Sequence, residues 1–221
     1  MKKLLILAIG VVLLLAVAAW AQEPTGGKLS YGFKAGFGMA TFSGSDAEPG
    51  AGVDKKYRTG FGGGGVLGFH LAPSISLQFE ALYLMKGVKY QATTGDSMET
   101  IKLDYIEVPI TLHVAPAMEG KVKPRVFAGP FFGFLLSAKD KAEGFADPAD
   151  NGEVDVKDAC KTIEFGLTIG AGVDFGMNKG AVTIDLRYDL GLSEIADSAG
   201  GPAPNWKNSG IFAMLGYRFD M

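Results

Sequence analysis

Residues 182–191 read VTIDLRYDLG, and this stretch decides the fold class. Every second side chain is aliphatic or aromatic, and the positions between them hold Thr, Asp, Arg, Asp and Gly. Successive side chains of a β-strand point to opposite faces of a sheet, so this period of two predicts a strand. Its three charged residues, Asp185, Arg187 and Asp189, share one face, and the apolar residues share the other.

The same alternation dominates the chain after residue 29. It is clearest in residues 75–85, 165–175 and 211–219, where apolar side chains again occupy alternate positions. Each predicted strand is at least as long as the about 9–11 residues that a tilted strand needs to cross a bilayer. We expect eight strands, near 30–42, 57–71, 74–87, 99–115, 122–138, 159–176, 180–192 and 207–219.

The strand expected at 99–115 changes phase within its length. Leu103 and Tyr105 stand on one parity, whereas Ile106, Val108 and Ile110 stand on the other. A β-bulge near Tyr105, or a strand that extends beyond the membrane, would explain this change.

Short and long connections alternate between the predicted strands. The short ones lie near 72–73, 116–121 and 177–179. The long ones, rich in Gly, Asp, Ser, Ala and Pro, are 43–56, 88–98, 139–158 and 193–206. This alternation is typical of outer-membrane barrels with short periplasmic turns and long extracellular loops. We therefore predict an all-β fold, an eight-stranded antiparallel up-and-down transmembrane β-barrel with both termini in the periplasm.

The polar face of the predicted strands carries isolated charges of both signs, six acidic and five basic. A near balance of charge suits the narrow, filled lumen of an eight-stranded barrel. Parity alone does not say which face is inside, so a secreted or periplasmic barrel of lipocalin type with an apolar interior stays open. The interspersed Arg and Asp and the loop pattern favour the membrane. The charges are Lys34, Glu80, Lys86, Glu107, Arg125, Glu164, Asp174, Asp185, Arg187, Asp189 and Arg218.

The N-terminus predicts export. Met1-Lys2-Lys3 is basic, residues 4–20 carry no charge, and Ala19-Trp20-Ala21 fits a small-x-small cleavage site. These features indicate a signal peptide over 1–21, followed by a barrel domain over 22–221. An uncleaved membrane anchor is the alternative, although the apolar run is short for a span of about 30 Å.

Composition excludes several classes of function. The chain has 221 residues, and 21 Lys and Arg against 24 Asp and Glu give a net charge of −3. No basic stripe is present, so we expect no nucleic-acid partner. Cys160 is the single cysteine, which excludes an intrachain disulfide, a zinc ribbon and a CxxC redox site.

The two histidines are the first candidates for chemistry. His70 and His113 fall on the predicted lumen face toward the periplasmic end, and a metal site there would need a third ligand, Glu80 or Asp174. A barrel lipase or deacylase would need a histidine that faces lipid near the outer leaflet, beside a serine. Neither histidine is so placed, and hydrogen bonding in the lumen is favoured. We therefore predict no catalytic, cofactor-binding or metal-binding residues.

Two further segments invite a binding hypothesis. Residues 147–155 are dense in oxygen ligands that suit calcium, but their spacing differs from an EF-hand, and a solvated acidic loop is favoured. Residues 60–65 resemble a phosphate loop but lack the following Lys-Ser/Thr, so their glycines are expected to allow close approach of a neighbour. Pro109 and Pro130 lie inside predicted strands, where we expect bulges or bends.

An ordered set of short motifs resembles the small outer-membrane β-barrel family often labelled "porin family protein", related to the PorT-like barrels. The motifs lie at residues 32–36, 82–87, 105–110, 129–135, 188–192 and 216–219. The resemblance implies location in the bacterial outer membrane and does not imply an open pore. It also implies the barrel assembly machinery as a partner, although such barrels commonly end on an aromatic residue and here Asp220 and Met221 follow Phe219.

The expected function is that of a non-enzymatic integral outer-membrane protein without a cofactor. Its barrel would anchor surface loops with a structural role or a ligand-binding, adhesive one, in contact with membrane lipid and lipopolysaccharide. The alternatives are a narrow channel for small solutes, a barrel-type lipid-modifying enzyme and a soluble carrier of an apolar ligand.

Overall fold

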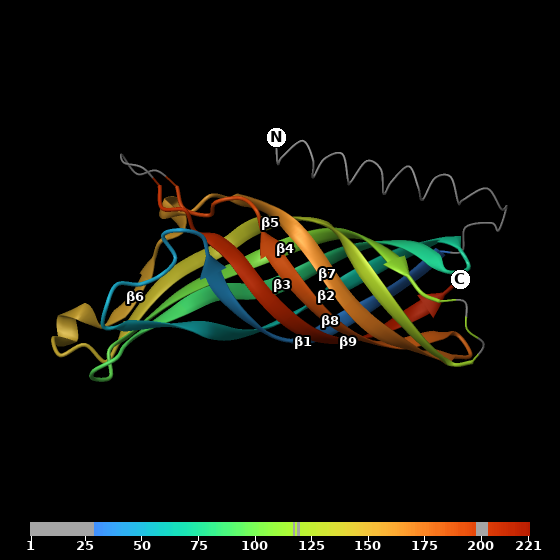
Figure 1. The fold of residues 1–221 in the computed structure, drawn as a ribbon, viewed down its shortest axis with the longest axis horizontal. Coiled ribbons are helices and arrows are strands. Elements are labelled where there is room, and N and C mark those ends of the chain that lie inside the picture. The colour runs from blue at the N-terminus through green and yellow to red at the C-terminus, as the bar shows by residue number, and fades with distance from the viewer. Residues whose placement is uncertain (1–28, 117, 119, 198–202) are drawn as a thin grey trace.

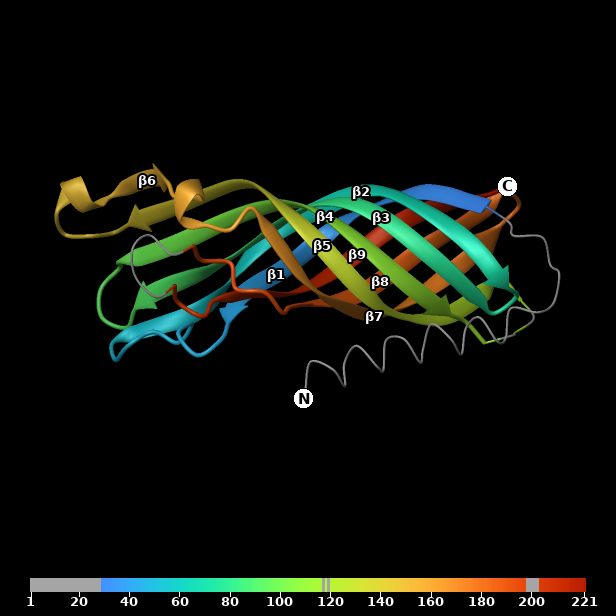
Figure 2. The same ribbon diagram turned by 90° about the horizontal axis from the view of Figure 1, so that it is seen from above.

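The computed structural model describes residues 29–116, 118, 120–197 and 203–221, and the predicted signal peptide lies outside these ranges. The described chain forms a long antiparallel β-barrel whose strands wrap obliquely around its axis (Figures 1 and 2). None of the helices in this described part is long and apolar enough to cross a membrane. The elements are β1 (Leu29–Ser43), β2 (Val53–Ala72), β3 (Ile75–Ala92), β4 (Met98–Val114), β5 (Val122–Glu143), η1 (Pro148–Asp150), β6 (Gly152–Asp155), η2 (Lys157–Ala159), β7 (Ile163–Met177), β8 (Gly180–Gly191) and β9 (Lys207–Asp220).

The predicted up-and-down barrel is confirmed. Consecutive long strands pair antiparallel, β5 pairs with β7, and β1 pairs with β9, so that eight strands close into one ring. The short strand β6 was not predicted; it pairs with β5 at residues 139–142, beside the ring. Closure leaves no free edge among the eight ring strands over most of their length, which a sheet in lipid requires.

The two ends of the barrel differ, and we name them the turn end and the loop end. The turn end holds the short connections and the C-terminus, and the loop end holds β6 (Figure 1). The predicted connections 43–56, 88–98 and 139–158 are too long, because β2 begins at Val53, β3 continues to Ala92 and β5 continues to Glu143. The strand expected from residue 159 begins later, at Ile163. Strands therefore continue into segments whose composition is typical of loops.

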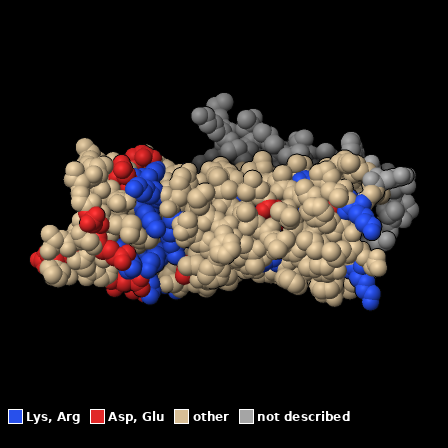
Figure 3. Space-filling model, turned by 90° about the horizontal axis from the view of Figure 1, so that it is seen from below, with Lys and Arg blue, Asp and Glu red and all other residues tan. Residues whose placement is uncertain are grey.

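Apolar side chains face outward over the middle of the barrel. Ile184 and Leu215 are 49% and 59% exposed, whereas Asp185 and Arg187 are each 2% exposed. Figure 3 shows a broad belt with few charges, bordered at the loop end by Lys and Arg side chains among which Asp and Glu also gather. This is the orientation of a transmembrane barrel, and the lipocalin-type alternative is wrong.

The change of phase in β4 has a cause in the interior. The register between β4 and β5 shifts between Asp104 and Tyr105, where β5 carries one additional residue, so the predicted bulge is present on the neighbouring strand. The pleat of β4 itself is continuous, since Leu103, Tyr105 and Glu107 are all buried. What changes along β4 is the polarity of the interior, as expected for a strand that extends beyond the membrane.

The glycines of the strands allow close contact between strands, whereas the prolines interrupt the hydrogen bonding of a strand pair. A Cβ on Gly64 would lie 1.9 Å from the carbonyl oxygen of Ala81, so the glycine run does permit a close approach. The bulges expected at Pro109 and Pro130 are wrong, because the β4–β5 pairs on both sides of this point share one register. A proline removes one ladder hydrogen bond without inserting a residue, so pairing is interrupted but does not shift.

Candidate functional site

The lumen of the barrel is filled by charged side chains. All eight ring strands except β2 contribute to it, because the polar parity of each strand faces inward. Ten of the eleven charged residues predicted for this face are buried, and Arg218 at the turn end is partly buried. Burial of a charge is costly unless it is paired, so the partner of each of these groups has to be identified.

A chain of ion pairs begins at the turn end. Arg218 Nη1 lies 2.7 Å from Asp174 Oδ2, and Arg125 Nε donates to Asp174 Oδ1 over 2.7 Å. Arg125 Nη2 in turn lies 2.5 Å from Asp185 Oδ1, and Lys34 Nζ lies 2.9 Å from Asp185 Oδ2. Each carboxylate is thus shared between two cations from different strands.

Arg187 continues this chain across the middle of the lumen. Its guanidinium lies 3.0 Å from Glu80, 2.6 Å from Glu107 and 2.8 Å from Asp189. Lys34 Nζ lies 2.7 Å from the other oxygen of Glu80, which joins the two halves. The planar guanidinium has donors on several edges, which suits the bridging of three carboxylates.

The chain ends under an aromatic layer. Lys86 is paired with Glu107, and its Nζ lies 2.7 Å from Glu164 Oε1. The same ammonium lies 4.5 Å from the ring centre of Phe131 and 5.5 Å from that of Tyr105. Cation–π attraction adds to the ion pairs here. A small apolar cluster of Leu82, Leu84, Phe212 and Met214 lies among the charges, and beyond this level apolar side chains replace them.

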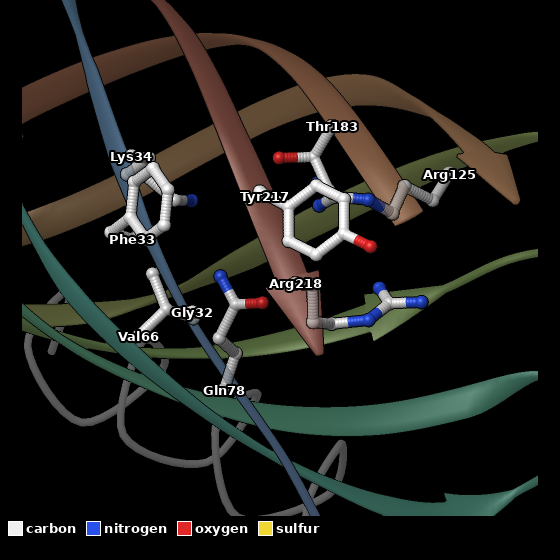
Figure 4. Close-up of a pocket in the computed structure, with 9 residues that line it drawn as sticks. All are labelled: Gly32, Phe33, Lys34, Val66, Gln78, Arg125, Thr183, Tyr217 and Arg218. Carbon is white, nitrogen blue, oxygen red and sulfur yellow. The ribbon is translucent and has the colours of Figure 1, made fainter. Parts of the chain in front are cut away.

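Little free space separates these groups at the turn end. Figure 4 shows side chains from several strands converging around a cavity of about 10 Å³, which is room for about one water molecule. Lys34, Arg125 and Arg218 belong to its lining and also to the ion-pair chain. The cavity is a gap in the network and is too small for a solute.

The histidines lie on the lumen face near the turn end, as predicted. His113 Nδ1 lies 2.7 Å from Arg125 Nη1, and its Nε2 lies 2.9 Å from Thr111 Oγ1. An arginine only donates, so Nδ1 accepts this hydrogen bond and the ring is the neutral tautomer with a proton on Nε2. His113 also stacks on Phe127, with ring centres 4.7 Å apart. His70 lies on β2, where its Cα pairs with that of Ser76 across the turn.

An apolar cluster fills the barrel at the loop end, and the sequence did not predict it. We name it the cap core. It combines inward residues of β1, β3, β4 and β5 with residues of two long connections. The sequence signal was the change of phase near Tyr105. Its buried members are Phe42, Ala47, Val88, Leu103, Tyr105, Leu135, Ala138 and Ile195.

The outside of this cap carries ion pairs. Glu153 of β6 accepts hydrogen bonds from Lys102 over 2.6 Å and from Lys139 over 2.7 Å. These hydrogen bonds lower the pKa of Glu153 to about 2. On the same outer face, Arg58 lies 3.6 Å from Asp104, which accepts a 2.9 Å hydrogen bond from Tyr83.

Apart from Glu153, side-chain oxygens of the acidic loop 147–155 accept hydrogen bonds from nearby backbone N–H groups. Asp147 Oδ1 accepts from the backbone N–H of Ala149 over 2.9 Å, and Asn151 Oδ1 accepts from that of Phe145 over 3.0 Å. Over the described residues, no group of three or more His, Cys, Asp or Glu is placed to hold a metal ion. Cys160, at the junction between loop and strand, is a free thiol that packs against the cap core.

The sequence matches the model of the outer membrane protein beta-barrel domain family over residues 20–197. No curated protein matches the chain.

Several solved structures resemble the fold. OprG from Pseudomonas aeruginosa is 12% identical, with 87% of this chain and 95% of that chain covered and a TM-score of 0.47. Neisserial surface protein A is 15% identical, with 86% and 97% covered and a TM-score of 0.47. Outer membrane protein W of E. coli is 16% identical, with 86% and 97% covered and a TM-score of 0.39.

Proposed function

Because the chain belongs to the outer membrane protein beta-barrel domain family and lies in the bacterial outer membrane, we propose that it is a non-enzymatic surface anchor. Its sealed barrel holds the loop end outside the cell, where the loops and the cap serve a structural role or bind a ligand in adhesion. Membrane lipid surrounds the barrel, and the barrel assembly machinery inserts it.

The observation that carries this proposal is the contrast between a filled lumen and an ordered cap. Three carboxylates meet Arg187 across the middle of the barrel, so a water path would require several buried ion pairs to separate. Beyond that level the strands continue, and residues 98–104 of β4 still pair with residues 137–143 of β5. A barrel built only to span the membrane has no need of such an extension.

The filled lumen disfavours the narrow channel. In an eight-stranded barrel the interior is just wide enough for side chains, and here they bond to one another across it. The cap core adds a second seal of apolar side chains at the loop end. A solute would have to displace both.

The geometry also disfavours the lipid-modifying enzyme. His113 is buried and is held between Arg125 and Thr111, and both ring nitrogens have a partner. It faces the lumen at the turn end, whereas acyl chains of the outer leaflet lie outside the barrel at the other end. The purified wild type and His113→Ala are therefore both expected to hydrolyse acyl chains only at the background rate.

Two measurements test the anchor. Protease added to intact cells is expected to cut within the connection between β5 and β7 and to spare the turns at 72–75 and 177–180. The purified protein in planar bilayers is expected to show no conductance steps. Cutting at the turns from outside would reverse the orientation, and stepwise conductance would establish the narrow channel instead.

A further inference from the structure

Lysines gather on the outer surface of the barrel at the loop end of the apolar belt. Four neighbouring strands, β2 to β5, each carry an exposed or partly exposed lysine beyond the apolar belt; on β2 a register shift between Tyr57 and Gly62 separates this lysine from the belt. Figure 3 shows such a basic border on the face that it draws. The last apolar residues of the belt are Phe61, Met85, Ile106 and Leu136, and the lysines are Lys56, Lys89, Lys102 and Lys139.

The pairing of the strands sets these lysines directly opposite one another. Lys56 is the register partner of Lys89 between β2 and β3, and Lys102 is the register partner of Lys139 between β4 and β5. Like charges directly opposite on neighbouring strands destabilise a sheet unless an anion lies between them. Two such pairs of opposed lysines therefore lie at the loop-end edge of the apolar belt, and each needs an anion.

The chain itself supplies the anion for one of the two pairs. The Glu153 carboxylate lies between Lys102 and Lys139, with one oxygen 2.6 Å from the first ammonium and the other 2.7 Å from the second. To place it there, the chain forms the extra strand β6 beside β5. Glu153 thus shows which ligand a cross-strand pair of lysines accepts: an anion with two or more oxygens.

The other pair has no such partner. Lys56 Nζ donates to the neutral amide oxygen of Gln91 over 2.6 Å. Within the described ranges, neither Lys56 nor Lys89 has a carboxylate oxygen within 4.0 Å, although the neighbouring Lys55 and Arg58 are each paired with an acid. Neither ammonium group is therefore neutralised by an acid of the described chain, and both lysines lie beyond the apolar belt, where we expect the headgroups of the outer leaflet to begin.

We propose that Lys56 and Lys89 bind a phosphate group of lipopolysaccharide. A lipid A phosphate carries the charge and the oxygens that Glu153 supplies to the other pair, and ammonium–phosphate hydrogen bonds are charge-assisted. Its acyl chains lie along the apolar belt directly below. The proposal concerns the lipid around the barrel and does not depend on what the loops bind.

The test compares Lys56→Gln/Lys89→Gln with the wild type in a neutral detergent, titrated with lipopolysaccharide. A lysine near an anionic surface contributes about fivefold in affinity, so the double variant is expected to bind about 30-fold more weakly. The matched control is Lys123→Gln/Lys179→Gln, which removes two exposed lysines at the turn end and is expected to bind as the wild type does. Equal affinity of the wild type and the first double variant would overturn the proposal, as would an equal loss in the control.

Two further arms identify the ligand group. Lipopolysaccharide freed of its phosphates is expected to bind the wild type and Lys56→Gln/Lys89→Gln alike. Glu153→Gln leaves the second lysine pair without its carboxylate and is expected to tighten lipopolysaccharide binding about fivefold. Inorganic phosphate that binds as tightly as lipopolysaccharide would overturn the assignment to a lipid.

Discussion

The membrane-spanning part of the barrel and the cap at the loop end are built by the same strands with opposite polarity. On β4, Glu107 points inward and Ile106 outward within the apolar belt, whereas Leu103 points inward and Lys102 outward in the cap. The pleat of the strand does not change between them. The surrounding medium therefore decides which face of a strand is apolar. Lipid surrounds the spanning part, so its outward face is apolar, whereas water surrounds the cap, so its inward face is apolar.

The two parts also depend on different forces. The interior of the spanning part consists mainly of paired charges beside one small apolar cluster, and removal of one charged partner leaves the other buried in a medium of low dielectric. The cap is held by the burial of apolar side chains, as in a soluble protein. Variants that act on one force should separate the two parts.

The largest effect is expected from Arg187→Met. It leaves Glu80, Glu107 and Asp189 facing one another without their shared cation. Loss of one partner from a buried ion-pair network costs about 3–5 kcal/mol of the free energy of unfolding. Urea unfolding of the protein in lipid vesicles, followed by the circular dichroism of the β-sheet, measures this change.

Arg187→Lys is the matched control, because it keeps one positive charge and loses the fork geometry. It is expected to lose clearly less stability than Arg187→Met. A cost below about 1 kcal/mol for Arg187→Met is the range of a solvated ion pair. Such a result would show that the lumen is wet, and it would contradict the proposed difference in stabilising force between the spanning part and the cap.

The next effect is expected in the cap, from Leu103→Ala. Leu103 is fully buried in the cap core, and such a truncation costs about 3 kcal/mol. The loss is expected to be local, so hydrogen exchange should quicken at residues 98–104 and 137–143 while amides within the apolar belt stay protected. Uniformly faster exchange along β4 would show that the cap and the spanning part unfold as one unit.

The sequence predicted the spanning part almost completely. Apolar and polar side chains alternate there because lipid and lumen impose opposite demands on the two faces, so the period of two fixes both the strand and its orientation. The eleven lumen charges followed from parity alone. Their individual pairings did not, because these depend on the stagger of strands around the ring.

The cap was not predicted, for a physical reason. Its core takes Ala47 and Ile195 from connections without any period, and only the closed barrel brings them together. The strand β6 holds one apolar residue, Val154, and its pairing depends on β5 continuing past the belt. Near Tyr105 the sequence showed that the apolar residues move to the other parity. It could not say whether the pleat of the strand or the polarity of the interior changes there.

A smaller effect is expected on the outer face. A lysine introduced in the apolar belt, in Ile184→Lys, is compared with the removal of the native lysine Lys102 in the cap. Ile184 is half exposed on the apolar belt, and a lysine on the lipid face costs about 2 kcal/mol. The control Lys102→Leu lies in the cap, where it breaks only a partly exposed ion pair, and is expected to cost less than about 1 kcal/mol. Unfolding of both variants in vesicles checks the pair; equal costs would place the edge of the lipid elsewhere than between these two levels.

The smallest effect concerns the cap alone and follows from Glu153. Hydrogen bonds from Lys102 and Lys139 lower its folded pKa from 4.5 to about 2. A lowered carboxyl pKa contributes stability that is complete above pH 4.5 and is lost as the pH falls toward 2. The pairing of β6 with β5 should therefore loosen across this window, seen as faster hydrogen exchange at residues 152–155, while the apolar belt is unaffected. Glu153→Gln should show no such dependence, because its amide does not titrate; loosening with the same midpoint in that variant would mean that other carboxyl groups hold β6 in place.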